Sequence, residues 1–201
     1  NTCSVCHGPS VMAIQEMGLP SCTLGQVRHR ADLIIYWAAN PLASHPRHLE
    51  RYTFFADGRF EKSAWADFMQ RKREKRANKQ CAVETSGQTG SEAKCQECHV
   101  DGLLSMKKKE GRKMIVFDVR KTMTADAADC FIQVEPNKDY ELMAALRALV
   151  NDQELDVDQV GGVPVECLEE VADAMINCNF GAIYYGLGLT NSFGKFRNVE
   201  I

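Results

Sequence analysis

The sequence predicts an α/β fold in which helices cover both faces of a mostly parallel sheet. Short apolar runs of strand length at 32–38 and 114–118 end in polar or turn-forming residues, as buried parallel strands do. Later segments repeat their apolar residues at helical spacing. Because strands that alternate with helices form layered sheets with right-handed crossovers, an αβα arrangement is expected.

Each element is expected in turn along the chain. The four expected strands are Asp32–Ala38, Met114–Asp118, Phe131–Val134 and Phe180–Leu189. The third is shorter and is expected nearer an edge of the sheet, and the fourth is interrupted by two glycines. Three helices are expected between the strands: Thr122–Ala128, Tyr140–Val150 and Val165–Asn177. Asp139, directly before the second helix, is the residue type that caps a helix N-terminus, so it is expected as its N-cap.

Residues 57–113 differ in composition from the rest of the chain. They carry 14 Lys and Arg against 9 Asp and Glu, so this segment is basic while the remainder is acidic. A connection of this length in a compact domain is either functional or disordered. We therefore divide the chain into 1–56, the first part of the α/β domain, a long charged insertion at 57–113, and 114–201, the remainder of the domain.

Composition excludes several classes of protein. The net charge of −3 gives no overall basic field for nucleic acid. No apolar run reaches the roughly 18 residues of a membrane span. Nine cysteines, an odd number, fall partly in expected core elements, which argues against a secreted disulfide framework and favours reduced thiols in the cytoplasm. The chain opens at Asn1 inside a motif, so a piece of a longer protein is expected.

The first chemistry-bearing motif is the Cys6-His7 pair, followed by Gly8 and Pro9. A thiolate is a ligand for soft or thiophilic metals, and a neighbouring imidazole can move a proton. A Cys-His dipeptide by itself is most often a chance pairing, so this motif carries weight only together with others.

Two segments, 3–7 and 95–99, have the form C-x-x-C-H, the attachment signature of c-type haem. Against a multihaem carrier, haem attachment occurs outside the cytoplasm, and no second axial ligand is evident in the sequence. Within the insertion, four residues of suitable type offer a zinc site instead: Cys81, Cys95, Cys98 and His99. A loop with uncoordinated thiols remains the alternative.

Polar residues also follow the expected strands. Asn40 and Pro41 end the first, and Asp118 ends the second with Arg120 and Thr122 just after it. In open α/β sheets ligands bind beyond the carboxyl ends of strands, where an acid can bind a ribose or a guanine edge and Arg and Thr can hold phosphate. The absence of G-x-G-x-x-G argues against an ordinary NAD site. The alternative role for Asp118 is to cap the next helix.

Two further segments admit two interpretations each. His45 can meet a phosphate or belong to a polar surface turn. Gly186 and Gly188 can bring backbone N–H groups close to a cofactor or form a turn at the sheet edge.

Taken together, these motifs resemble a known family. The stretches that carry the resemblance, in order, are 5–10, 22–27, 30–37, 40–41, 45–48, 118–122, 133–136, 139–142, 186–190 and 194–195. They are similar to the B subunit of formylmethanofuran dehydrogenase, within the molybdopterin oxidoreductase superfamily that includes formate dehydrogenases. The match omits the insertion. It implies a Rossmann-like domain of the molybdopterin oxidoreductase type, with 1–56 supplying the active-site loop.

The resemblance also implies a cofactor and residue roles. Cys6 would bind tungsten or molybdenum, completing the sulfur ligands of a bis(molybdopterin guanine dinucleotide) cofactor, and His7 would assist proton transfer. The residues expected at the cofactor are Asn40, Pro41, His45, Asp118, Arg120, Thr122, Asp139, Gly186 and Gly188. The reaction would be the reduction of CO2 to formate for formylation of methanofuran in archaeal methanogenesis.

The implied setting is a multi-subunit cytoplasmic oxidoreductase complex supplied by ferredoxin-type electron donors. An iron–sulfur cluster is expected outside this segment, and the isolated segment is expected to be inactive. Two alternatives remain: the metal-free related subunit of a formyltransferase/hydrolase complex, and a non-catalytic α/β scaffold subunit. Retention of Cys6 and His7 favours the dehydrogenase, because a metal-free relative has no use for the thiol.

Overall fold

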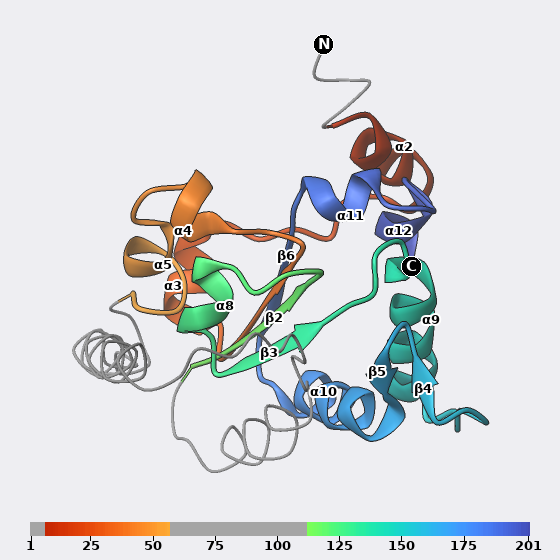
Figure 1. Cartoon of the computed structure of the whole chain (residues 1–201). Helices are drawn as coiled ribbons and strands as arrows, with labels where there is room; N and C mark the ends of the chain where they lie inside the picture. The colour runs from red at the N-terminus through yellow and green to blue at the C-terminus, as the bar shows by residue number, and fades with distance from the viewer. Residues whose placement is uncertain (1–6, 57–111) are drawn as a thin grey trace, which may run out of the picture.

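The computed structural model describes residues 7–56 and 112–201 (Figure 1). Its centre is a parallel sheet in the order β3-β2-β1-β6. The strands are β1 (Leu33–Trp37), β2 (Lys113–Asp118), β3 (Cys130–Gln133) and β6 (Gly181–Tyr185). The expected α/β class and parallel sheet are confirmed, and β3 lies at an edge as expected.

Helices and one small hairpin complete the described part of the chain. The hairpin pairs β4 (Gln159–Val160) with β5 (Val163–Pro164). The helices are α2 (Gly8–Met17), α3 (Leu24–Arg30), α4 (Pro41–Ser44), α5 (His48–Arg51), α8 (Met123–Ala127), α9 (Asp139–Val150), α10 (Val165–Asn177), α11 (Leu187–Asn191) and α12 (Arg197–Glu200). Within residues 7–56 and 112–201, none of these helices combines the length and apolarity that crossing a bilayer requires.

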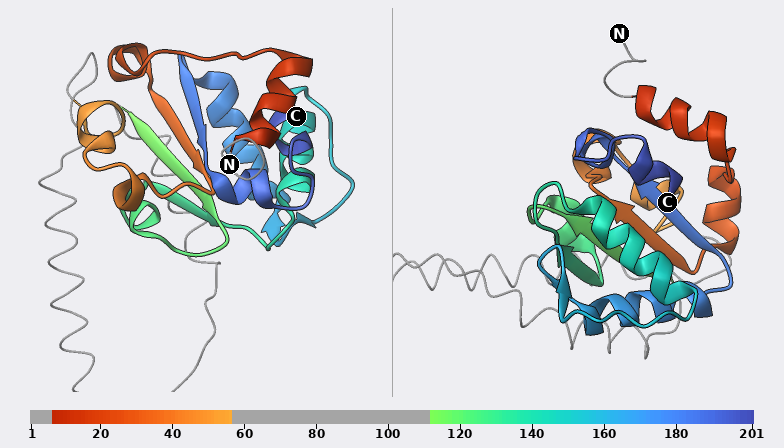
Figure 2. Two further views of the ribbon diagram at one scale, coloured as in Figure 1. Left: turned by 90° about the horizontal axis from the view of Figure 1, so that it is seen from above. Right: turned by 90° about the vertical axis from the view of Figure 1, so that its right-hand side faces the viewer.

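Two helical layers cover the centre of the sheet, β1 and β2, as Figure 2 shows from above and from the side, whereas the edge strand β6 leaves Ile183 and Tyr185 exposed. Side chains alternate along β1, so Ile35 and Trp37 face α9 and α10 while Ile34 and Tyr36 face α3, α5 and α8. All five residues of β1 are buried. A strand covered on both faces explains why its sequence is a continuous apolar run rather than an alternating one.

Arg112 joins the start of β2 to the end of the segment before residue 57. Its side chain is buried, and its guanidinium donates to the carbonyl oxygens of Ala31 (2.8 Å), Ala56 (3.4 Å) and Thr53. It also donates to the carbonyl of Arg28, at the end of α3. The side chain therefore satisfies backbone acceptors that would otherwise be buried without partners.

The structure changes two expectations about the elements. The fourth strand ends at Tyr185 rather than Leu189, because the chain turns at Gly186 and residues 187–191 are helical. β2 begins at Lys113 rather than at Met114, and Arg112, the residue before it, is buried. The expectations for 57–111, including the zinc ligands, lie outside the described residues.

Several elements were not expected from the sequence. The helix α3 has a capping box, in which Thr23 accepts from Gln26 N while the Gln26 side chain accepts from Thr23 N. The β4–β5 hairpin turns at Gly161 and Gly162, whose φ angles of 55° and 78° suit a two-residue turn. The Thr23–Gln26 pair and the Gly161-Gly162 pair are sequence signals for these two elements that the search for apolar periodicity did not include.

Asp32 fixes the amino ends of β1 and β6. Its carboxylate accepts hydrogen bonds from Asn179 N (2.8 Å), Asn179 Nδ2 (2.7 Å) and Phe180 N (3.0 Å). Partial burial alone would raise the pKa of Asp32, but these hydrogen bonds together lower it below its usual value. A depressed pKa means that the folded state is stabilised above the unfolded-state pKa and loses this contribution as the pH falls through the folded-state pKa.

We therefore predict that Asp32→Asn lowers the free energy of unfolding at neutral pH by about 1–3 kcal/mol, since charged hydrogen bonds are lost. The difference from the wild type should shrink in acid, where Asp32 is protonated in both states. Urea unfolding at neutral and acidic pH measures this. Asp156→Asn, at an exposed position, is the control and should change neither value. An equal difference at both pH values would contradict the prediction.

Candidate functional site

The carboxyl ends of β1 and β6 form the point at which the strand order reverses. From β1 the chain proceeds outward to β2 and β3, and then returns by way of α9 and α10 to place β6 on the other side of β1. In open parallel sheets this reversal separates the loops that follow the two adjacent strands and leaves a crevice between them. The loops at this position begin at Ala38 and Gly186.

In this chain the first residues of the two loops are in contact, and the hollows lie on either side of that contact rather than between the loops. Gly186 N donates to Trp37 O at 2.9 Å, and a Cβ added at Gly186 would lie 2.2 Å from Ala38 O. A Cβ at Gly188 would lie 2.7 Å from Ala38 Cβ. Ala38 itself has a φ of 48°, which an L-residue rarely adopts. Both glycines are thus required by the contact with Ala38.

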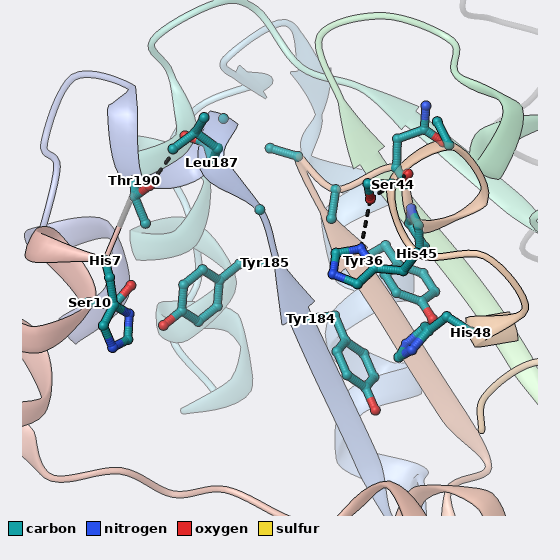
Figure 3. A pocket seen from close by; sticks show the side chains of 17 residues that line it. His7, Ser10, Tyr36, Ser44, His45, His48, Tyr184, Tyr185, Leu187 and Thr190 are labelled. Carbon is teal, nitrogen blue, oxygen red and sulfur yellow. Dashed lines mark hydrogen bonds between the residues drawn. The ribbon is translucent and has the colours of Figure 1, made fainter. Parts of the chain in front are cut away.

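On one side of this contact lies a pocket of about 680 Å³. Figure 3 shows His7 and Ser10 on one wall, His45 and His48 on the other, and Tyr184 and Tyr185 of β6 between them. His7 occupies the N-cap position of α2, and α2 packs against α12. Histidine and aromatic side chains therefore dominate this compartment, which we call the aromatic pocket.

The base of the aromatic pocket is a set of packed rings. Tyr36 stacks on Tyr184 with ring centroids 5.3 Å apart, and His48 meets Tyr184 edge-on at 5.2 Å. Burial, and then the neighbouring His45, lowers the pKa of His48, so its imidazole is neutral at neutral pH. Burial, with an added effect of Cys22, raises the pKa of Tyr184 to about 12. These groups present hydroxyls and a neutral imidazole rather than charges.

On the other side lies a second pocket of about 580 Å³, lined by polar and charged groups, which we call the polar pocket. Its lining includes Asp118, Arg120, Thr122, Asp139 and Asn191. Ala38, Asn40 and Gly188 line both pockets, so the two compartments adjoin along the carboxyl edge of the sheet.

Hydrogen bonds hold the strand-end loops of β1 and β2 together. Thr124 Oγ1 donates to Asn40 Oδ1 at 2.7 Å and accepts from Leu42 N at 3.3 Å. The N-cap of α8 is Thr122, whose hydroxyl accepts from Ala125 N at 3.3 Å. Asp118 Oδ1 instead accepts from Arg120 N at 3.3 Å, which turns the loop after β2. The capping role considered for Asp118 thus belongs to Thr122.

Asp139 has a different role from the expected N-cap. The N-cap of α9 is Lys138, and Asp139 is the first helical residue, with 4% of its surface exposed. Its Oδ1 accepts from Trp37 Nε1 at 2.8 Å, and the Trp37 ring stacks on Phe117 at 4.2 Å. The N-cap expectation was wrong because a partner distant in sequence fixes the carboxylate. Trp37, missed by sequence reasoning, holds Asp139 at the wall of the polar pocket.

The structure thus brings most of the expected residues to one edge of the sheet. His7, Asn40, Pro41, His45, Gly186 and Gly188 line the aromatic pocket, and Asn40, Asp118, Arg120, Thr122, Asp139 and Gly188 line the polar pocket. Cys6 and the four zinc candidates, Cys81, Cys95, Cys98 and His99, lie outside the described residues. Within 7–56 and 112–201, no group of three or more His, Cys, Asp or Glu side chains is arranged to hold a metal ion.

Comparison with known proteins gives two similarities over the whole chain. The chain is 38% identical over 200 residues to the B subunit of tungsten-containing formylmethanofuran dehydrogenase 2 from Methanocaldococcus jannaschii. It is 36% identical over 200 residues to the protein of the same name from Methanococcus maripaludis. Both alignments cover 100% of this chain and 36% of the relative, so the chain spans about a third of their length. No model of a protein family matches the chain.

The contact between Gly186 and Ala38 leads to a testable pair of variants. We predict that Gly186→Ala destabilises the fold by more than about 2 kcal/mol, since the added methyl must displace the backbone at Ala38 O. Gly25→Ala, whose Cβ would lie 3.8 Å from Thr23 Oγ1 in α3, should be neutral or stabilising. Urea unfolding of the two variants measures both. Equal midpoints for the two would contradict the close approach of the loops.

Proposed function

The chain is similar over its whole length to the B subunit of tungsten-containing formylmethanofuran dehydrogenase, and from this we propose that it forms the active-site part of such a catalytic subunit. In this proposal Cys6 supplies the thiolate ligand of tungsten or molybdenum. The carboxyl edge of the sheet holds part of a bis(molybdopterin guanine dinucleotide) cofactor. The reaction is the reduction of CO2 to formate for formylation of methanofuran.

The observation that carries the proposal is the location of His7 on the same edge as the polar strand-end loops. His7 lines the aromatic pocket, and that pocket shares Ala38, Asn40 and Gly188 with the polar pocket. A ligand that begins beside residue 6 and extends along this edge therefore meets the aromatic pocket first and the polar pocket second. A long cofactor with a reactive end and a nucleotide end has this form.

The donor and acceptor groups of the polar pocket fit a nucleotide tail. Arg120 and the Thr122 hydroxyl are groups that bind phosphate, and both line the pocket. The carboxylates of Asp118 and Asp139 can accept from ribose hydroxyls or from the N–H groups of guanine. Asp139 is buried and held by Trp37, so it is oriented before a ligand arrives.

The chain's own residues supply positioning and proton transfer. When bound, the metal cofactor supplies two-electron transfer. The imidazole of His7, next to the ligating residue, can give or take a proton beside the metal. Burial raises the pKa values of Tyr36 and Tyr184, so both phenols stay protonated. The packed rings of Tyr36, Tyr184 and His48 present an aromatic surface to the reacting end.

The wider setting of the enzyme follows from the same proposal. The chain spans 36% of its relatives' length, so activity is expected from a longer polypeptide rather than from this segment alone. Other subunits, a ferredoxin-type electron donor and an iron–sulfur cluster outside the segment complete the proposed cytoplasmic complex. A metal-free subunit of a formyltransferase/hydrolase complex and a scaffold subunit are the competing functions.

Elemental analysis of the full-length protein in its native complex tests the proposal. We predict that the wild type carries tungsten or molybdenum and that Cys6→Ala lowers its content at least about tenfold, since a metal-bound thiolate is lost. Cys178→Ala is the matched control, because Cys178 lies beside Gly181 and Asp32 at the opposite edge of the sheet. That variant should keep the metal.

Each outcome of this measurement is decisive. Metal retained in Cys6→Ala would remove Cys6 as the ligand. If the wild type contained neither tungsten nor molybdenum, the proposed dehydrogenase function would be overturned, and the metal-free subunit or the scaffold subunit would be favoured. The same measurement determines the zinc content. Loss of zinc from a variant lacking Cys95 and Cys98 would support the proposed zinc site in the insertion.

A second prediction concerns proton transfer. His7→Asn should lower the turnover of the complex by about 10²–10⁴, the usual contribution of a general acid or base, while leaving the tungsten or molybdenum content unchanged. Turnover measured together with metal content separates the two effects. A variant with full metal and full turnover would show that His7 moves no proton in the rate-limiting step.

A further inference from the structure

The wall of the aromatic pocket that follows β1 carries Ser44 next to His45. Ser44 Oγ lies 2.8 Å from His45 Nδ1, and both residues line the pocket. Figure 3 shows this hydrogen bond, with the remainder of the His45 ring directed into the cavity. The Nε2 atom of His45 lies on the other side of the ring from Nδ1, so it is the nitrogen that a ligand in the pocket can reach.

The hydrogen bonds of Ser44 determine which nitrogen of His45 carries the proton. Ser44 is the last residue of α4, and its hydroxyl donates to Asn40 O at 3.0 Å, the bond that serine commonly makes to the carbonyl four residues earlier. A hydroxyl has one proton, so Ser44 Oγ can only accept from His45 Nδ1. His45 Nδ1 is therefore the donor, and a neutral His45 has its lone pair on Nε2.

The pocket around this imidazole suits an uncharged ligand. Among the residues that the structure describes, its lining contains no Lys, Arg, Asp or Glu, whereas the lining of the polar pocket contains Arg120. Burial, and then the neighbouring His45, lowers the pKa of His48, so His48 adds no positive charge. A phosphate group therefore finds its cationic partner in the polar pocket, and the aromatic pocket is left to an uncharged heterocycle.

We propose that Ser44 is the positioning residue of His45, and that the pair presents Nε2 as the acceptor for an N–H group of the cofactor's pterin ring. This inference rests on the proposed function. A pterin carries an exocyclic amine and ring N–H groups, which are donors, whereas the phosphates of a dinucleotide carry acceptors. A neutral imidazole with its lone pair on Nε2 accepts from such donors and cannot donate to a phosphate through this nitrogen. The phosphate contact considered for His45 is the competing role.

Substitutions of His45 that keep one property of the imidazole at a time separate the two roles. His45→Gln keeps an uncharged acceptor, His45→Lys keeps a positive charge without an acceptor, and His45→Ala keeps neither. His29→Lys, at an exposed position of α3, is the matched control. Each variant is made in the full-length protein and purified in its native complex. During dialysis in dilute urea, the retained cofactor is measured as pterin fluorescence after oxidation and as GMP after acid hydrolysis.

A second pair of variants tests the positioning by Ser44. Ser44→Ala removes the hydroxyl, and Ser44→Thr keeps it. The Asn40 carbonyl also accepts from Ala43 N and Ser44 N at 3.1 Å each, so α4 keeps its backbone hydrogen bonds in both variants. Ser21→Ala, at an exposed position between α2 and α3, is the control.

We expect His45→Ala, His45→Lys and Ser44→Ala to lose the cofactor about 2- to 10-fold faster than the wild type, the usual effect of one missing hydrogen bond. His45→Gln, Ser44→Thr and both controls should match the wild type. Wild-type retention in His45→Lys would overturn the acceptor role and favour a phosphate contact. Wild-type retention in Ser44→Ala, or an equal loss from Ser44→Thr, would overturn the positioning by Ser44. A wild-type complex that contains neither pterin nor GMP would overturn the proposed function as well, so the two failures are distinguishable.

Discussion

The parallel pairing of β1 with β2 on one side and β6 on the other determines the arrangement of the whole site. Because the strands run in the same direction, their carboxyl ends lie at one edge, and loops distant in sequence meet there. Trp37, the last residue of β1, faces one layer and holds Asp139, whereas Tyr36 faces the other layer and stacks on Tyr184. One strand thus orients groups in both pockets.

The contact of Gly186 and Gly188 with Ala38 gives the edge its two compartments. The backbones meet so closely that no side chain fits between them, and a histidine-rich, aromatic space remains on one side and a charged space on the other. Asn40 reaches both and is fixed by Thr124. A ligand with chemically different ends can therefore lie along one edge with each end in a suitable environment.

Much of this edge could be predicted from the sequence, because buried parallel strands are continuous apolar runs and ligands bind beyond their carboxyl ends. The strand order could not be predicted from the sequence, since it depends on which helix and sheet faces pack against each other. The role of Asp139 could not be predicted from neighbouring residues either. An acidic residue is common both at the N-cap of a helix and in its first turn, and the position of Asp139 is fixed by its hydrogen bond with Trp37, which is distant in sequence. By contrast, the Thr23–Gln26 capping box and the Gly161-Gly162 turn are local signals that apolar periodicity alone does not detect.

Arg112 has a consequence for how this chain can vary in length. The chain leaves the described fold after Ala56 and returns at Arg112, and the guanidinium bonds the Ala56 carbonyl, so both ends of the intervening segment are held at one place. Because Arg112 and the carbonyl groups that it binds all belong to the described fold, the register of β1 and β2 is fixed on either side of residues 57–111 by contacts that do not depend on the length of that segment.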